Sequence, residues 1–200
     1  MKILLVIVVL VLAAVGAFIA RNDPAEPAAS QTVEPPVTAL TTAEQPTATT
    51  APPMLGQALT LSDLDGWLQA DFAGLDELRG QVVIVQFWTF GCYNCKNTLP
   101  YLQDIYADYH DAGLEIVGVH SPEFDYEREP EAILSAARDL GVTWPIALDT
   151  NKHNFFAWQG SPAYWPRTYV LDQDGLIRFD HVGEGKYDEL EQTVAALLGA

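Results

Sequence analysis

The stretch of sequence that decides the fold of this 200-residue chain reads Gln81-Val-Val-Ile-Val-Gln-Phe-Trp88-Thr-Phe-Gly91-Cys92-Tyr-Asn-Cys95-Lys-Asn-Thr-Leu-Pro100. It contains the only two cysteines, Cys92 and Cys95, between an apolar run that predicts a buried strand and a run with helical periodicity. At such a junction the first sulfur lies at the helix N-terminus, where free backbone N–H groups favour the thiolate. The second sulfur lies one turn further along the same face, within reach to close a disulfide. The pattern therefore indicates a dithiol suited to thiol–disulfide exchange.

Four other interpretations of the cysteine pair stay open. A purely structural disulfide would restrain little chain entropy, because it closes so short a loop. Half of a zinc site would need a second pair of ligands, and no other Cys or His pair stands at ligand spacing. A Cys–His hydrolase would use a lone nucleophile with a separate base. Thr89-x-x-Cys92 also resembles a peroxidase motif, but the resolving Cys95 nearby favours dithiol exchange.

The charge of the chain argues against one class of partner. The formal net charge is -17 at pH 7, and from Met54 onward 23 acidic and 8 basic side chains leave about -15. Nucleic-acid binding needs a basic face, so we expect no nucleic-acid partner. The same charge is unfavourable for lying on an anionic lipid surface. We interpret the acidity as a solvated surface that aids solubility.

Residues 1–20 form an apolar segment, uncharged for the 18 residues from Ile3 to Ala20. As a helix this stretch spans about 27 Å, close to the bilayer core. A cleaved signal peptide normally has a shorter apolar core and a clearer cleavage site. We therefore expect an uncleaved N-terminal membrane anchor, and the flanking charges favour a domain on the extracytoplasmic side. The predicted location is the cell membrane, single-pass, where an exported disulfide can persist.

Residues 21–53 are rich in Pro, Thr and Ala, with seven prolines and almost no large apolar side chain. Such a segment cannot bury enough surface to fold, and its prolines favour an extended form. We interpret it as a disordered linker. Residues 54–200 then form one domain, long enough to enclose a core.

Periodicity predicts an α/β fold for this domain. The expected strands cover residues 81–88, 114–120, 144–149, 167–172 and 176–182, and the expected helices cover 95–109, 130–140, 155–158 and 187–198. Residues 55–80 are expected to be irregular, apart from one helical turn at 75–78. This order predicts a mixed central sheet with helices on both faces. In such folds the site forms beyond the carboxyl ends of the central strands, where Cys92 and His120 both fall.

Four motifs carry a resemblance to a known family. They are Phe87-Trp-Thr-Phe-Gly-Cys-Tyr-Asn-Cys-Lys-Asn-Thr-Leu-Pro-Tyr101, Gly118-Val-His-Ser-Pro-Glu-Phe124, Tyr164-Trp-Pro-Arg-Thr-Tyr-Val-Leu-Asp172 and His181-Val-Gly-Glu-Gly185. Together they resemble the thioredoxin-like thiol–disulfide oxidoreductases of the membrane-tethered TlpA/ResA group, and most closely the redoxin domain of DipZ-type proteins. The resemblance covers about residues 66–200. It implies the thioredoxin fold, with Cys92 as the nucleophile and Cys95 as the resolving thiol.

The same resemblance implies a substrate groove beside the dithiol. Pro166 matches the family's cis-proline, and a cis X–Pro bond is rare enough to make this a sharp expectation. Trp165 would make the groove wall aromatic, although an ordinary proline at a strand start would also explain the pair. Trp88 resembles the family's Trp next to the active site, and plain core packing can hold at the same time.

The dipeptide between the cysteines bears on the direction of electron flow. Tyr93 and Asn94 border the predicted groove and include no cation to stabilise the Cys92 thiolate. A strongly oxidising pair depends on such stabilisation. The sequence therefore favours a reductant or disulfide carrier.

One departure from the family concerns proton transfer. Thioredoxin places a buried Asp two residues before the Trp, and this chain has Gln86 there, which cannot take a proton. The ResA-like Glu three residues after the second Cys is also absent, because Thr98 occupies that position. By strand placement the nearest candidates are Glu123 and His120, and loop or strand-end structure is the alternative role for both.

The sequence thus predicts a membrane-tethered, extracytoplasmic protein-disulfide oxidoreductase, reducing the disulfides of exported proteins, with apocytochrome c among the candidate substrates. Electrons would come from a membrane thiol donor, and no metal or cofactor beyond the Cys92–Cys95 disulfide is expected. The alternatives are a disulfide-introducing oxidase, a copper-chaperone-like module and, less favoured, a peroxidase. Copper-chaperone relatives use a Cys-x-x-x-Cys spacing, one residue longer than here.

Overall fold

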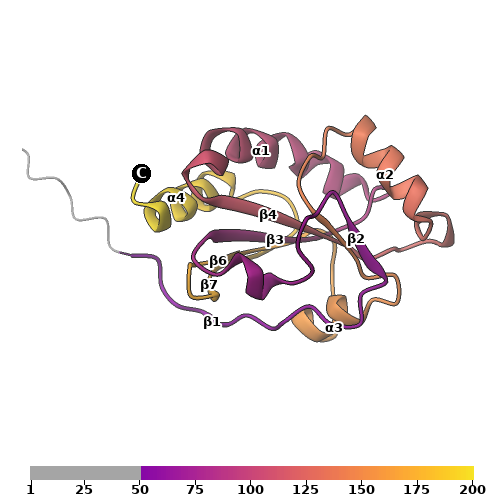
Figure 1. The fold of residues 1–200 in the computed structure, drawn as a ribbon, viewed down its shortest axis with the longest axis horizontal. Helices are drawn as coiled ribbons and strands as arrows, with labels where there is room; N and C mark the ends of the chain where they lie inside the picture. The colour runs from indigo at the N-terminus through magenta and orange to yellow at the C-terminus, as the bar shows by residue number, and fades with distance from the viewer. Residues whose placement is uncertain (1–50) are drawn as a thin grey trace, which may run out of the picture. The chain divides into compact units, whose positions relative to one another are not determined.

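A seven-stranded mixed sheet lies at the centre of the structure (Figure 1). The computed structural model describes residues 51–200, so the expected anchor and nearly all of the expected linker lie outside the described residues. The strand order across the sheet is β1-β7-β6-β3-β4-β5-β2. The strands are β1 Gly56–Gln57, β2 Gly66–Leu68, β3 Val82–Trp88, β4 Leu114–His120, β5 Ile146–Leu148, β6 Arg167–Leu171 and β7 Leu176–Val182.

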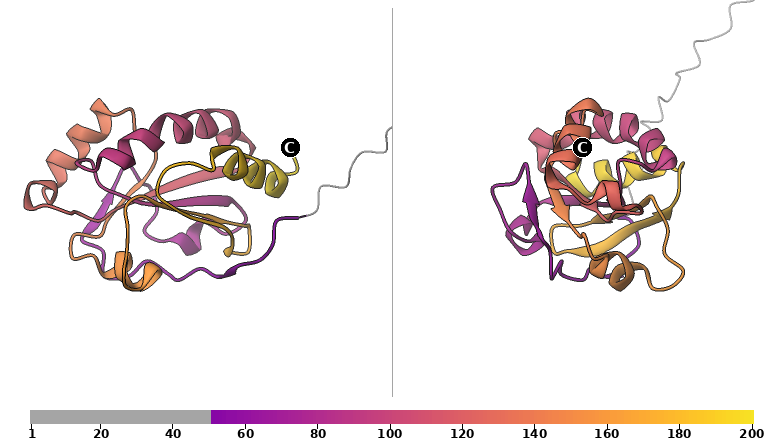
Figure 2. Two further views of the ribbon diagram at one scale, coloured as in Figure 1. Left: turned by 180° about the vertical axis from the view of Figure 1, so that it is seen from behind. Right: turned by 90° about the vertical axis from the view of Figure 1, so that its right-hand side faces the viewer.

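Helices cover both faces of the sheet, with α1, α2 and α4 on one side and α3 on the other (Figures 1 and 2). The helices are α1 Tyr93–Tyr109, α2 Pro130–Asp139, α3 His153–Gln159 and α4 Tyr187–Leu198, with 3-10 turns at Leu75–Leu78, His110–Ala112 and Asp125–Glu127. This arrangement is the thioredoxin-like α/β fold that the sequence predicts.

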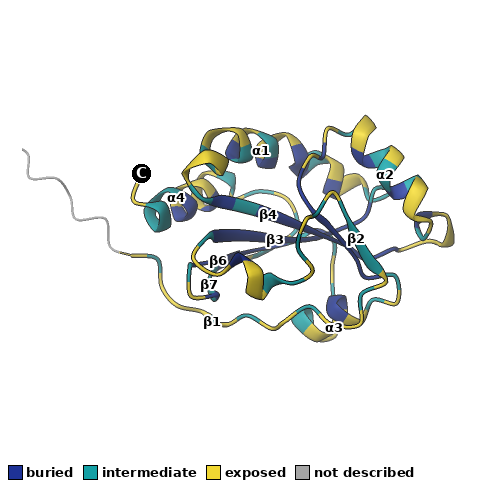
Figure 3. Cartoon of the chain, viewed as in Figure 1, coloured by how far each residue is buried: buried dark blue, intermediate teal, exposed yellow. Residues whose placement is uncertain are grey.

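The alternation of side chains along β3 divides the core into two layers. Val82, Ile84 and Trp88 pack in the cluster that includes α1, α2 and α4, whereas Val83 and Phe87 pack in the cluster on the α3 side. Every residue of β3 is buried (Figure 3). A strand covered on both faces reads as a continuous apolar run, which is why this element could be predicted from the sequence.

The register of the strands brings three chain segments to one end of the sheet. β3 and β4 run parallel, with Trp88 opposite His120. β6 runs antiparallel to β3, with Arg167 opposite Phe87, so Pro166 directly before β6 lies at the same end. The sequence that follows β3 therefore leads into α1 at the point where β4 ends and β6 begins.

The region 55–80 contains two strands that the sequence analysis did not predict. β1 has two residues and pairs with β7, and β2 has three residues and pairs with β5. They lie at the two edges of the sheet, and none of their residues is fully buried. Strands this short and this exposed leave no detectable alternation in the sequence.

None of the helices within residues 51–200 is long and apolar enough to span a membrane. The predicted anchor at residues 1–20 lies outside the described part of the chain.

Candidate active site

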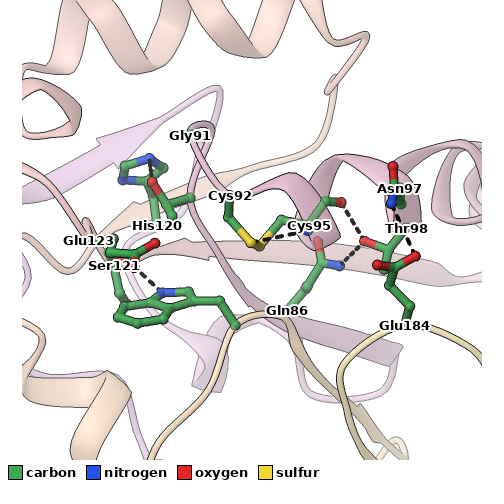
Figure 4. Close-up of a disulfide and its surroundings, with 12 residues drawn as sticks. Gln86, Gly91, Cys92, Cys95, Asn97, Thr98, His120, Ser121, Glu123 and Glu184 are labelled. Atoms are coloured by element: carbon green, nitrogen blue, oxygen red, sulfur yellow. Dashed lines mark hydrogen bonds between the residues drawn. A yellow bond between two sulfur atoms is a disulfide. The ribbon is translucent and has the colours of Figure 1, made fainter.

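The two cysteines meet at the N-terminus of α1 and are joined by a disulfide, with Cα atoms 5.3 Å apart (Figure 4). Cys92 is the N-cap residue of α1, and its Sγ accepts the backbone N–H of Cys95 at 3.1 Å. An N–H directed at sulfur, together with the positive end of the helix dipole, favours a thiolate at Cys92. Cys92 is partly exposed, whereas Cys95 is completely buried. An incoming disulfide can therefore reach Cys92 but not Cys95.

The predicted groove residues lie at the same end of the sheet as the Cys92 sulfur. Tyr93 is among the most exposed aromatic side chains of the described domain, at 72%, and Asn94 is exposed beside it. The Trp165–Pro166 peptide bond is cis. Trp165 donates its indole N–H to the carbonyl oxygen of Ser121 at 2.9 Å, and this bond connects the proline loop to the end of β4. Its ring also stacks on Phe155 of α3, with centroids 4.1 Å apart.

Trp88 and His120 lie opposite each other at the ends of β3 and β4, next to the loop that leads to Cys92. Trp88 is completely buried and packs edge-on against the His120 ring. The His120 ring also stacks on Phe90, and its Nε2 lies 3.3 Å from the Thr89 hydroxyl. Burial lowers the pKa of His120 to about 4, although the nearby Glu127 carboxylate acts in the opposite direction. The imidazole is therefore neutral at pH 7 and adds no positive charge near Cys92.

Glu123 is exposed, and its described hydrogen bond to the site comes from its backbone and not from its side chain. Its N–H donates to the Glu127 carboxylate at 2.6 Å. No hydrogen bond joins the Glu123 or His120 side chain to either cysteine within residues 51–200. A proton-transfer role for either residue stays a prediction.

Glu127 belongs to this region as well, although the sequence did not predict a role for it. It is completely buried, and its carboxylate accepts three backbone N–H groups, from Gly91 at 2.9 Å, Glu123 at 2.6 Å and Phe124 at 2.9 Å. Gly91 directly precedes Cys92, so this carboxylate holds the loop that leads into the dithiol. The only signal was a Glu at the third position of a turn, a place where such side chains accept N–H groups.

Gln86 and Thr98 lie behind Cys95. The Gln86 side-chain N–H donates to the Thr98 hydroxyl at 2.9 Å, and that hydroxyl donates to the Cys95 carbonyl oxygen at 2.7 Å (Figure 4). All three residues are buried. The position of the thioredoxin Asp and that of the ResA-like Glu are here filled by neutral side chains that bond to each other.

Within residues 51–200, no group of three or more His, Cys, Asp or Glu side chains is arranged to hold a metal ion. The described groups with redox chemistry at this site are the two sulfur atoms. That no cofactor beyond the disulfide is needed stays a prediction.

Fold and dithiol together define a thioredoxin-like protein of the thiol–disulfide oxidoreductase class. The chain belongs to the AhpC/TSA family, whose profile matches residues 50–180.

Comparisons with individual proteins agree with this class. Protein DipZ of Mycobacterium bovis is 37% identical over 146 residues, which are 72% of this chain and 21% of DipZ. The chain thus spans about a fifth of that relative's length. Thiol-disulfide oxidoreductase ResA of Bacillus thuringiensis is 26% identical over 117 residues, 58% of this chain and 64% of ResA. The crystal structure of a thiol:disulfide interchange protein DsbE from Chlorobium tepidum shares the fold, with a TM-score of 0.61, 20% identity, and coverage of 74% of this chain and 100% of that one.

Proposed function

We propose that this domain reduces disulfide bonds in exported proteins on the extracytoplasmic side of a membrane, to which residues 1–20 anchor it through the linker 21–53. The observation that carries the proposal is the contrast between the two sulfurs. Cys92 is reachable and accepts a helix N-terminal N–H, whereas Cys95 is completely buried one turn behind it. This asymmetry supports attack by Cys92 and resolution by Cys95.

The exchange runs in two displacements. The Cys92 thiolate attacks one sulfur of a substrate disulfide, the substrate S–S bond breaks, and the other substrate sulfur leaves as a thiolate that takes a proton. Cys95 then attacks the Cys92 sulfur of the mixed disulfide, the bond from Cys92 to the substrate breaks, and the leaving substrate sulfur takes the Cys95 proton and departs as a thiol. The substrate gains two electrons and two protons, and the Cys92–Cys95 disulfide forms. A membrane thiol donor then returns two electrons to this pair.

Two features support the reducing direction. In the disulfide form the Cys92 sulfur accepts one described N–H bond, from Cys95, and the nearby His120 is uncharged at pH 7. Strong oxidants of this class depend on greater stabilisation of the thiolate. The named activity of the ResA relative, thiol–disulfide oxidoreduction, fits either direction. Apocytochrome c is one candidate among the exported substrates.

Turnover of a model protein disulfide tests the proposal. The full-length chain should accelerate the reduction of insulin by dithiothreitol, and Cys92→Ser should lower the rate to that of dithiothreitol alone. Cys95→Ser should instead accumulate a mixed disulfide between Cys92 and the substrate, visible on a non-reducing gel. Retained turnover in Cys92→Ser, or peroxide consumption at substrate level in place of insulin reduction, would contradict the proposal. Tight binding of Cu(I) to the reduced pair, without turnover, would favour the metal-binding alternative.

A further inference from the structure

A buried polar chain runs from β3 to the resolving cysteine. Gln86 on β3 is 0% exposed, and its side-chain N–H is bound to the Thr98 hydroxyl of α1. Thr98 in turn donates to the Cys95 carbonyl oxygen, so two hydrogen bonds connect Gln86 to the turn that carries the resolving sulfur. Figure 4 shows the Gln86 amide lying below Cys95 along this chain.

The Thr98 hydroxyl fixes which way the Gln86 amide points. Its proton is used on the Cys95 carbonyl oxygen, so toward Gln86 it can only accept a hydrogen bond. The amide nitrogen must therefore face Thr98, and the amide oxygen must face away. That oxygen, Oε1, is buried and has no hydrogen-bond partner within residues 51–200. A buried acceptor without a partner is costly, and such a group needs an explanation.

Reduction of the disulfide creates a donor in the core cluster that borders Gln86. Cys95 packs in the core cluster that also contains Ile84 and Trp88, the neighbours of Gln86 on its face of β3. Cys95 is 0% exposed in the disulfide form, so a thiol in this position has no bulk water to donate a hydrogen bond to. The oxidised protein thus has a buried acceptor without a donor, and reduction adds a buried donor that needs an acceptor.

We propose that Gln86 is a positioning residue for the exchange, whose Oε1 accepts a hydrogen bond from the reduced Cys95 thiol. The inference rests on the proposed function. When a dithiol donor reduces the pair, two electrons break the Cys92–Cys95 bond, Cys95 takes a proton, and that S–H turns to the Gln86 oxygen. Gln86 gains and loses no proton. It stabilises the reduced form and is left without a partner in the oxidised form, and both effects favour reduction.

The variant Gln86→Met tests this inference, because methionine has similar length and neither a donor nor a comparable acceptor. The equilibrium constant for reduction of the full-length chain by glutathione should fall about tenfold, which is a potential about 30 mV more negative. Gln103→Met is the matched control. Gln103 lies on α1, and its side-chain N–H groups bond to the backbone carbonyls of Leu140 and Gly141, but the described bonds do not connect it to Cys95. Its equilibrium constant should equal that of the unmodified chain.

The same variant separates a redox role from a merely structural one. If Gln86 only supports the fold, Gln86→Met lowers the unfolding free energy of both redox forms equally and leaves the equilibrium constant unchanged. That result would overturn the inference. If the unmodified chain forms no reversible disulfide with glutathione, the proposed function itself fails, which is a different outcome.

A second measurement uses the unmodified chain and does not depend on the folding of a variant. The side-chain carbonyl carbon of Gln86 should change its NMR chemical shift on reduction, as a carbonyl does when it gains a hydrogen bond. The Gln103 carbonyl carbon is the internal reference and should not move. A Gln86 carbonyl shift that changes no more on reduction than the Gln103 carbonyl shift would contradict the proposed bond.

Discussion

The Glu127 carboxylate accepts the backbone N–H of Gly91 at 2.9 Å and so connects the loop after β4 to the residue that precedes the reactive cysteine. The same carboxylate accepts the N–H groups of Glu123 and Phe124. Three N–H donors around one buried carboxylate compensate for its lost hydration. We infer that this group holds the position from which Cys92 attacks.

Glu127→Gln should destabilise the domain. The new amide NH2 would face backbone N–H groups, so at least one hydrogen bond to a charged acceptor is lost, about 2–3 kcal/mol of unfolding free energy. Urea denaturation of the oxidised protein measures the change. Glu129→Gln, at an exposed position of the same acidic run, is the control and should leave the stability unchanged. Equal stabilities of the two variants would contradict the role assigned to Glu127.

Gly91→Ala should disturb the same contact from the other side. A Cβ atom at Gly91 would meet the Glu127 Oε1 and the Tyr126 hydroxyl, so the carboxylate must move. Gly74→Ala, with open space around its Cβ position, is the control. Because Gly91→Ala and Glu127→Gln disrupt one contact, their double variant should lose less unfolding free energy than the two single losses added. Full additivity would show that the two residues act independently.

The buried His120 predicts a loss of stability in acid. The unfolded chain takes up a proton at His120 near pH 6.5, but the folded protein takes it up only near pH 4, because burial lowers this pKa. Between these values the unfolded state binds more protons, so the unfolding free energy falls as the pH falls, by up to about 3 kcal/mol. Above pH 6.5 this contribution is constant.

Denaturation of His120→Asn from pH 4 to 7.5 checks this prediction. The variant should lose most of the pH dependence in that window, whereas His153→Asn, which changes an exposed histidine, should keep it. The same slope in all three proteins would show that another group titrates.

Tyr93 is expected to contribute to substrate binding and not to stability. Tyr93 lies between the two cysteines in the sequence and is 72% exposed, so Tyr93→Ala removes little buried surface. Contact with a protein substrate through an aromatic ring is worth about 1 kcal/mol or more, so kcat/KM for insulin should fall roughly fivefold. Reduction of the same variant by dithiothreitol, which is too small to use this contact, should be unchanged. A parallel loss with both reagents would indicate damage to the dithiol instead.

Much of the fold could be predicted because its main elements carry strong local signals. β4, β7 and α4 begin and end at the predicted residues, and β3 differs by one residue at its start. The fully buried β3 and β4 read as apolar runs, and α4 reads as an apolar stripe. The short edge strands β1 and β2 have no such signal, since their pairing depends on partners about 80 to 120 residues away.

The site could be predicted where spacing, strand order or the family resemblance indicates a role, as for the cis peptide bond before Pro166. Cys92 and Cys95 were found by spacing, and His120 was expected at the same end of the sheet because parallel strands end together. Glu127 stands among several acidic residues in the sequence. Its burial depends on the tertiary contact with Gly91, which the sequence pattern does not reveal. The hydrogen bond between Gln86 and Thr98 likewise joins β3 to α1. Which residues of these two elements face each other depends on how the elements pack.

The most direct test of the central claim is the equilibrium reduction potential of the Cys92–Cys95 pair, measured on the full-length chain in dithiothreitol and glutathione buffers. A reductase of exported disulfides predicts a value near that of thioredoxin, about -270 mV. A value near that of DsbA, about -120 mV, would contradict the reducing direction and make the protein a disulfide-introducing oxidase.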